Sequence, residues 1–235
     1  MVLDYHMSPK PGKHAGARKT VARPLDKLAP GAFATLSGRD LTDMVVAGAT
    51  WIEGAASELN ALNVFPVPDG DTGTNMLLTL RATIEEARAC PAPANVGAVA
   101  QAMAHGALMG GRGNSGVILS QFFQGIAQAF RGKDTAAAGD VADALAVGTD
   151  LAYKAVSSPV EGTMLTVLKD AAAAARGAAA RGAGALDVLD AAVRAAWESV
   201  ARTPDLLPVL REAGVVDAGG KGTAVLLDGA VRFLR

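Results

Sequence analysis

From about residue 38 onward, apolar residues recur every three or four positions along almost the whole chain. The first such series includes Leu41, Val45 and Ile52, and this spacing places their side chains on one face of a helix. Half of the 235 residues are hydrophobic but only 4% are aromatic, so Ala, Val, Leu and Gly must form most of the core. Small side chains allow helices to pack closely, and the pattern therefore predicts an all-α protein without a convincing strand. Trp51 falls on an apolar stripe and is expected in this core.

Glycine and proline divide this periodic region into about eight helices. The expected helices cover about 39–62, 75–89, 95–108, 117–130, 138–156, 163–180, 185–202 and 223–235, with a short helical turn framed by Pro204 and Pro208. The segments between helices that are richest in polar residues or glycine are 63–75, 106–116, 157–163 and 214–222. Because alternate loops of an antiparallel bundle lie at the same end, we expect these four segments to meet there.

Residues 1–37 are interpreted as a flexible basic leader that precedes a single domain covering residues 38–235. The first 30 residues contain six Lys or Arg, two Asp and four Pro, and they show no apolar periodicity. Tyr5 is the only aromatic residue among these charges, which argues against a nucleic-acid partner. The chain has one cysteine, no signal-peptide core and no uncharged apolar run of about 18 residues, so we expect a cytoplasmic protein without a membrane span.

The segment 63–76 carries the strongest chemical signal. One glycine separates Asp69 from Asp71, which places two hard oxygen ligands close together, as Mg²⁺ or Ca²⁺ requires. Asn63 offers a third oxygen. A plain Asp-Gly turn is the alternative explanation. An EF-hand is excluded, because Leu80 stands where the twelfth position of that loop requires Glu.

The glycine-rich segment 110–116 opens directly into a helix and is a candidate phosphate site. Backbone N–H groups at a helix N-terminus attract anions, and glycines allow phosphate oxygens to approach closely. Arg112 adds a charge, Asn114 an amide and Ser115 a hydroxyl. A helix–helix connection with small residues for close packing explains the same pattern, and the residues alone leave both interpretations open.

The two later segments carry weaker signals. Thr163 is a good helix N-cap, which is a sufficient structural explanation for it. The segment 214–222 looks like a P-loop but is not one, because Val215 stands at the first required Gly and Gly222 at the required Ser or Thr. A glycine that ends one helix, followed by the N-cap of the next, explains this segment equally well.

As a whole, the run from Asn63 to Met76 resembles the metal-binding loop of the dihydroxyacetone kinase L (DAK2) domain. It is most similar to the version at the front of bacterial fatty acid kinase A proteins. With the motifs in the other three segments, the resemblance covers about residues 38–235. It implies an antiparallel eight-helix barrel with a nucleotide site at one end. There, two Mg²⁺ ions would join the phosphates of ATP or ADP to the acidic loop.

The resemblance also implies a role for each matching residue. Asp69 and Asp71 would hold the metal ions and thereby act in catalysis, and Asn63 would be a further metal ligand. The turn 113–116 would contact the phosphates, and Met164 would lie near the base. The nucleotide-binding residues implied in this way are Thr72, Thr74, Asn75, Arg112, Gly113, Asn114, Ser115, Gly116, Thr163, Met164, Asp217, Gly219 and Gly220.

The resemblance implies a kinase whose acceptor is a fatty acid presented by a separate binding protein. Dihydroxyacetone kinases carry three aspartates at the metal site, and Asn63 at the first of these positions favours the fatty acid kinase A branch. Those proteins continue into a middle and a C-terminal domain, so this chain is either part of a longer protein or a stand-alone one. The alternatives are an L-type subunit of a dihydroxyacetone (glycerone) kinase and a non-catalytic regulatory nucleotide-binding module. The sequence identifies neither the acceptor nor the oligomeric state.

Overall fold

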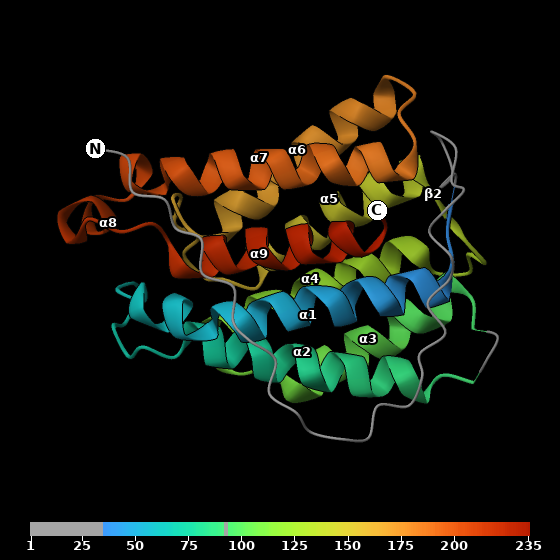
Figure 1. The fold of residues 1–235 in the computed structure, drawn as a ribbon, viewed down its shortest axis with the longest axis horizontal. Coiled ribbons are helices and arrows are strands. Elements are labelled where there is room, and N and C mark those ends of the chain that lie inside the picture. Colours follow the sequence, from blue (N-terminus) through green and yellow to red (C-terminus); the bar gives the residue numbers. More distant parts are fainter. Residues whose placement is uncertain (1–34, 92–93) are drawn as a thin grey trace, which may run out of the picture. The chain divides into compact units, whose positions relative to one another are not determined.

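The computed structural model describes residues 35–91 and 94–235, which form an all-α domain (Figure 1). The long helices in this part of the chain are α1 (Gly38–Ala61), α2 (Thr72–Ala89), α3 (Val96–Gly110), α4 (Gly113–Phe130), α5 (Ala138–Lys154), α6 (Met164–Ala180), α7 (Ala185–Leu206) and α9 (Ala218–Phe233). A six-residue helix, α8 (Pro208–Ala213), lies between α7 and α9. The predicted all-α class is confirmed. None of the described helices is both long and apolar enough to cross a membrane.

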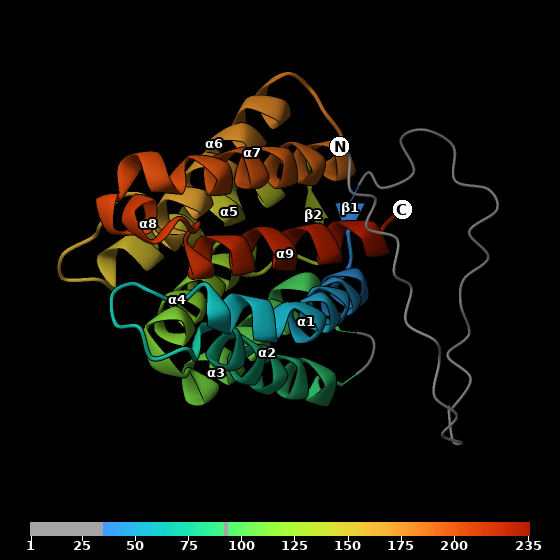
Figure 2. The ribbon, with the colours of Figure 1, turned by 60° about the vertical axis from the view of Figure 1, so that its left-hand side comes forward.

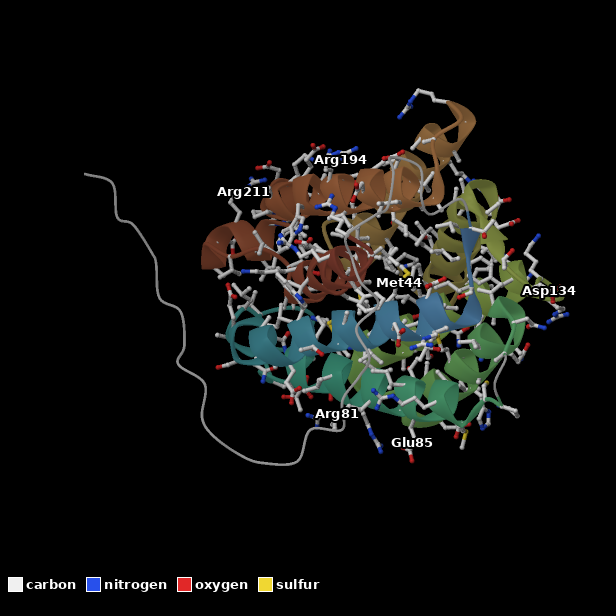
Figure 3. All side chains as sticks on the ribbon, turned by 45° about the vertical axis from the view of Figure 1, so that its right-hand side comes forward. Met44, Arg81, Glu85, Asp134, Arg194 and Arg211 are labelled. Carbon is white, nitrogen blue, oxygen red and sulfur yellow. The ribbon has the colours of Figure 1, made fainter. Side chains whose placement is uncertain are left out.

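The eight long helices form a closed ring. Each helix from α1 to α6 packs against the next one in the chain, and α9 packs against both α7 and α1. Figure 2 shows α1 to α4 on one side of the ring and α5, α6, α7 and α9 on the other. Met44 on α1 points into the ring, whereas Arg81 and Glu85 on α2 point outward (Figure 3). The apolar face of each helix is therefore buried against two neighbours, as the periodicity of the sequence requires.

Three helices begin three or more residues earlier than the sequence pattern predicts, and the first of them is α2, which starts at Thr72 instead of residue 75. α4 starts at Gly113, and α9 starts at Ala218 rather than after Gly222. The glycines of α9 serve close packing between helices: a Cβ atom at Gly220 would lie 2.8 Å from a γ-carbon of Val167 on α6. Glycine at these positions therefore does not mark a loop, because helix–helix contact and loop conformation favour the same residue.

The N-terminal boundary of the domain also differs from the predicted one. β1 (Thr35–Leu36) pairs in antiparallel fashion with β2 (Ala136–Ala137), although no strand was predicted. Ser37 forms a capping box with Asp40 at the start of α1, its hydroxyl accepting the Asp40 backbone N–H at 3.2 Å. Both features belong to the domain and not to the leader. The rest of the predicted leader, residues 1–34, lies outside the described residues.

Trp51 is not a core residue, contrary to the expectation from its position in the apolar stripe. It is 45% exposed and packs closely against Gly229 of α9. The guanidinium of Arg232 lies 4.8 Å from the centre of the indole ring, which is a cation–π distance. Trp51 lies instead at the edge of the α1–α9 contact, where the ring covers the contact from outside.

Candidate functional site

A pocket of about 470 Å³ lies at one end of the ring, where the four segments predicted to converge do meet. Its lining comes from the α1–α2 loop, the first turns of α4, the α5–α6 loop with the start of α6, and the start of α9. The residues singled out from the sequence that line it are Asn63, Asp69, Asp71, Thr72, Gly113, Asn114, Ser115, Thr163, Met164, Asp217 and Gly219.

The α1–α2 loop contributes the acidic part of the lining. Asn63 is buried, with 7% of its surface exposed, and its side-chain amide donates a hydrogen bond to Oδ1 of Asp69 at 2.6 Å. Asp71 is the N-cap residue of α2, yet its carboxylate makes no capping hydrogen bond. Within the described residues, no group of three or more His, Cys, Asp or Glu side chains is arranged for a metal. Two carboxylates with an adjacent amide suit Mg²⁺, which commonly binds one or two carboxylates and completes its shell with water and substrate phosphates.

The N-terminus of α4 contributes the part of the lining suited to an anion. Gly113, Asn114 and Ser115 form its first turn and line the pocket. No side chain of the described residues caps this helix, and the first N–H with an intrahelical partner is that of Gly116, which donates to the Arg112 carbonyl. The backbone N–H groups before it therefore remain available, and the helix dipole adds positive potential at the same place.

Side chains of α2 hold this first turn of α4 in place. The Thr79 hydroxyl accepts the Arg112 backbone N–H at 3.2 Å and donates to the Asn75 carbonyl at 2.8 Å. Gly113 has a φ of +56° and packs directly against the side-chain amide of Asn75. Both the backbone conformation and the lack of space require glycine at this position. The acidic loop and the first turn of α4 are thus fixed relative to each other through α2.

Some residues implied by the resemblance do not line the pocket: Thr74, Asn75, Arg112, Gly116 and Gly220. Asn75 and Gly116 instead pack where α2 meets the α4 turn. Thr74 is tied to Asn60 of α1 through its backbone N–H and its hydroxyl. These contacts indicate that the motif residues divide into two groups, one facing the pocket and one joining the helices behind it.

Apolar residues that the sequence did not single out complete the lining: Phe65, Pro66, Val67, Val117, Ile118, Ala155, Val156, Val160 and Leu165. Val117 and Ile118 follow Asn114 by three and four residues on α4, so helical spacing alone would have placed them on the same face. Ser157 and Ser158 also line the pocket. Their position depends on the conformation of the α5–α6 loop, for which the sequence carries no periodic signal.

Asp217 is the one buried carboxyl of the described pocket lining, with 5% of its surface exposed. Its Oδ2 accepts the backbone N–H of Gly220 at 2.6 Å and so caps α9. Its own backbone N–H donates to the hydroxyl of Thr203 at 3.0 Å. Burial raises the pKa of Asp217 to about 6, although hydrogen bonds from the backbone N–H groups of Gly220 and Met164 act to lower it.

All charged side chains among the described residues that line the pocket are carboxylates. Asp69, Asp71 and Asp217 line it, and none of the described lining residues is Lys, Arg or His. Lys221, the lysine of the P-loop-like segment, forms an ion pair with Glu58 of α1 instead. A ligand rich in phosphate would be repelled by these carboxylates unless cations lay between them.

Known bacterial proteins are similar to this chain in sequence. The protein YloV of Bacillus subtilis is 47% identical over 201 residues, which cover 86% of this chain and 36% of YloV. An uncharacterized protein of Staphylococcus epidermidis is 43% identical over 200 residues, which cover 85% of this chain and 36% of that protein. The chain therefore spans little more than a third of the length of these relatives.

Among solved structures, the dihydroxyacetone kinase from C. freundii, in complex with AMP-PNP and Mg²⁺, superposes with a TM-score of 0.64. The two sequences are 20% identical, and the match covers 94% of this chain and 38% of the kinase chain. At this identity the likeness shows a shared fold. The model of the DAK2 domain family matches residues 66–232, which include the acidic loop, the α4 turn and the start of α9. Because this match covers well over half of the sequence, the chain belongs to the DAK2 domain family.

Proposed function

We propose that this domain binds ATP or ADP together with Mg²⁺, and that it is the nucleotide-binding part of a kinase. The observation that carries the proposal is the composition of one pocket: two carboxylates, Asp69 and Asp71, and an uncapped helix N-terminus at Gly113–Ser115, with no basic side chain among the described lining residues. Two Mg²⁺ ions held by the carboxylates would neutralise the phosphates that the α4 N-terminus binds. The likeness to a kinase that was crystallised with AMP-PNP and Mg²⁺ supports the same assignment.

The remaining lining suits the nucleoside. Met164 is 3% exposed at the start of α6, and Val156, Val160 and Leu165 line the pocket with it. A flat, largely apolar base is accommodated by such side chains, whereas the hydroxyls of Ser157 and Ser158 are suited to the polar edges of the ligand. The pocket volume of about 470 Å³ lies within the usual range for small-molecule sites.

Phosphoryl transfer requires little covalent chemistry from the protein. In this proposal Mg²⁺ supplies charge neutralisation for the transferred phosphoryl group, and the chain supplies its position. Asp69 and Asp71 orient the ions, and the Asn63 amide holds Asp69 through their 2.6 Å hydrogen bond. The backbone N–H groups of Asn114 and Ser115 would hold the phosphates.

Nucleotide binding is expected to depend on a divalent cation. In isothermal titration, ATP should bind in the presence of Mg²⁺ and show no measurable affinity in excess EDTA, because the acidic lining repels free phosphate. Titration with adenosine serves as the control, since it lacks phosphates and should be insensitive to EDTA. Equal affinity for ATP with and without Mg²⁺ would contradict a metal bridge at Asp69 and Asp71.

For the acceptor, we propose a fatty acid presented by a separate binding protein. Support comes from the resemblance of the 63–76 segment to fatty acid kinase A, and from Asn63 at a position where dihydroxyacetone kinases carry aspartate. Dihydroxyacetone is the alternative acceptor, favoured by the fold shared with a dihydroxyacetone kinase. A non-catalytic regulatory module is a further alternative, because no acceptor site is evident among the described residues that line the pocket.

The 235-residue chain is expected to bind Mg-ATP but to transfer phosphate slowly, because no acceptor site is evident beside the pocket in the described residues and positioning supplies much of the rate. The chain would be incubated with Mg-ATP, fatty acid and a fatty acid-binding protein, and in parallel with Mg-ATP, dihydroxyacetone and a dihydroxyacetone-binding partner protein. Acyl phosphate or dihydroxyacetone phosphate measures each activity. Fast turnover by the 235-residue chain would contradict this expectation and identify a self-sufficient kinase.

A further inference from the structure

Glu161 lies in the α5–α6 loop, next to residues that line the pocket, but it does not line the pocket itself. Its carboxylate accepts hydrogen bonds from three side chains on the two helices that the loop joins. The Tyr153 hydroxyl of α5 donates to Oε1 at 3.1 Å, the Thr166 hydroxyl of α6 donates to Oε2 at 2.6 Å, and Lys169 of α6 donates to Oε1 at 2.7 Å. The Glu161 carboxylate thus connects the helix before the loop to the helix after it.

The backbone of the loop is held at the same place. The Gly162 N–H donates to the Thr166 hydroxyl at 2.8 Å, so Thr166 links the loop backbone to the Glu161 carboxylate. Gly162 has a φ of +83°, and a Cβ atom there would lie 2.9 Å from the Cβ atoms of Leu206 and Leu207. The loop therefore packs closely against the end of α7, and its backbone conformation there favours glycine. Val160 and Thr163, on either side of Glu161 and Gly162 in the sequence, line the pocket.

Charge favours the ionised form of Glu161 in this cluster. Partial burial acts to raise the pKa of Glu161, but the hydrogen bonds from Lys169, Thr166 and Tyr153 outweigh it and hold the pKa below its usual value. Lys169 also lies 5.8 Å from the centre of the Tyr153 ring. The carboxylate thus accepts all of these hydrogen bonds at neutral pH.

We propose that Glu161 is a positioning residue for the nucleotide: its contacts with Tyr153, Thr166 and Lys169 fix the α5–α6 loop in the conformation that forms the pocket. The inference rests on the proposed nucleotide function and adds a residue that does not touch the ligand. A loop that is ordered before binding avoids the entropy cost of ordering during binding. The cluster should therefore affect affinity more than it affects stability, because ion pairs that are half exposed contribute little to folding.

The test uses two variants that break the cluster from opposite sides, Glu161→Gln and Lys169→Met. Titration with Mg-ATP should show a dissociation constant about five- to tenfold higher for each, while the melting temperature of the free protein stays close to that of the wild type. Amide hydrogen exchange over residues 156–163 should be faster in the free variants. Lys169→Arg keeps the charge and should retain affinity close to that of the wild type.

Asp170→Asn provides the matched control. Asp170 follows Lys169 on α6 and accepts a hydrogen bond of 2.8 Å from Arg202 of α7, but it has no link to the loop. This variant should bind Mg-ATP with unchanged affinity. If the wild type binds Mg-ATP and Glu161→Gln binds it equally well, the positioning role is rejected while the proposed function stands. If the wild type binds no Mg-ATP, the proposed function fails and the positioning role fails with it.

Discussion

Replacing either Asp69 or Asp71 by Ala is expected to abolish Mg-ATP binding and leave the helical fold intact. Both carboxylates line an acidic pocket in which no described Lys, Arg or His can take over phosphate binding. Mutation of a residue that only orients a metal ligand already lowers metal affinity or activity by about 10- to 100-fold. The loss of a ligand itself should therefore lower the affinity for Mg-ATP by more than this. Stability should change little, because relief of the repulsion between the two carboxylates of the metal-free protein opposes the cost, in Asp69→Ala, of losing the hydrogen bond from the Asn63 amide.

Titration calorimetry with Mg-ATP measures the binding, and far-ultraviolet circular dichroism together with a thermal melt measures the fold. Glu85→Ala is the matched control, because Glu85 is an exposed carboxylate of α2 that points away from the ring (Figure 3). It removes the same charge from the helix that follows the acidic loop. Binding similar to that of the wild type in Asp69→Ala or Asp71→Ala would show that the metal lies elsewhere.

Replacing Asp217 by Asn is expected to stabilise the protein at pH 8 and to have little effect at pH 3.5. Burial raises the pKa of this carboxyl from 3.8 to about 6 in the folded state. The folded state therefore binds the proton more tightly than the unfolded chain does. As the pH rises from 3.8 through 6, the wild type loses stability, and above pH 6 the loss is constant. A shift of about two pKa units corresponds to at most about 3 kcal/mol.

The amide introduced by Asp217→Asn would still offer an oxygen to the Gly220 N–H, so the cap of α9 should survive. Urea unfolding of both proteins at several pH values measures the difference in free energy of unfolding. Asp150→Asn controls for the loss of one carboxylate, since Asp150 is exposed on α5 and does not line the pocket. A stability difference between Asp217→Asn and the wild type that is the same at pH 3.5 and pH 8 would contradict a buried, protonatable carboxyl.

Much of the fold follows from local sequence patterns. Apolar spacing of three or four residues placed the long helices within a few residues of their observed ends, and the four polar segments were expected to meet at one end, as they do. Start positions were less predictable where glycine is dense. Glycine is needed at Gly220 and Gly113 because the backbone there lies close to Val167 and Asn75. In the sequence, a glycine required for such a contact looks the same as a glycine in a loop. The roles of the motif residues in binding stay predictions.

Local sequence is sufficient to establish the all-α class, the division into helices and the pair of carboxylates beside a glycine-rich helix start, because these depend on neighbours within a few positions of the chain. Packing between distant segments was needed to show that α9 closes the ring against α1 and that Trp51 covers this contact from outside. The same packing buries Asp217 and joins Glu161 to two helices behind the pocket. Periodicity specifies which face of a helix is buried, but not which atoms of distant segments meet that face, and burial and hydrogen bonding depend on those atoms.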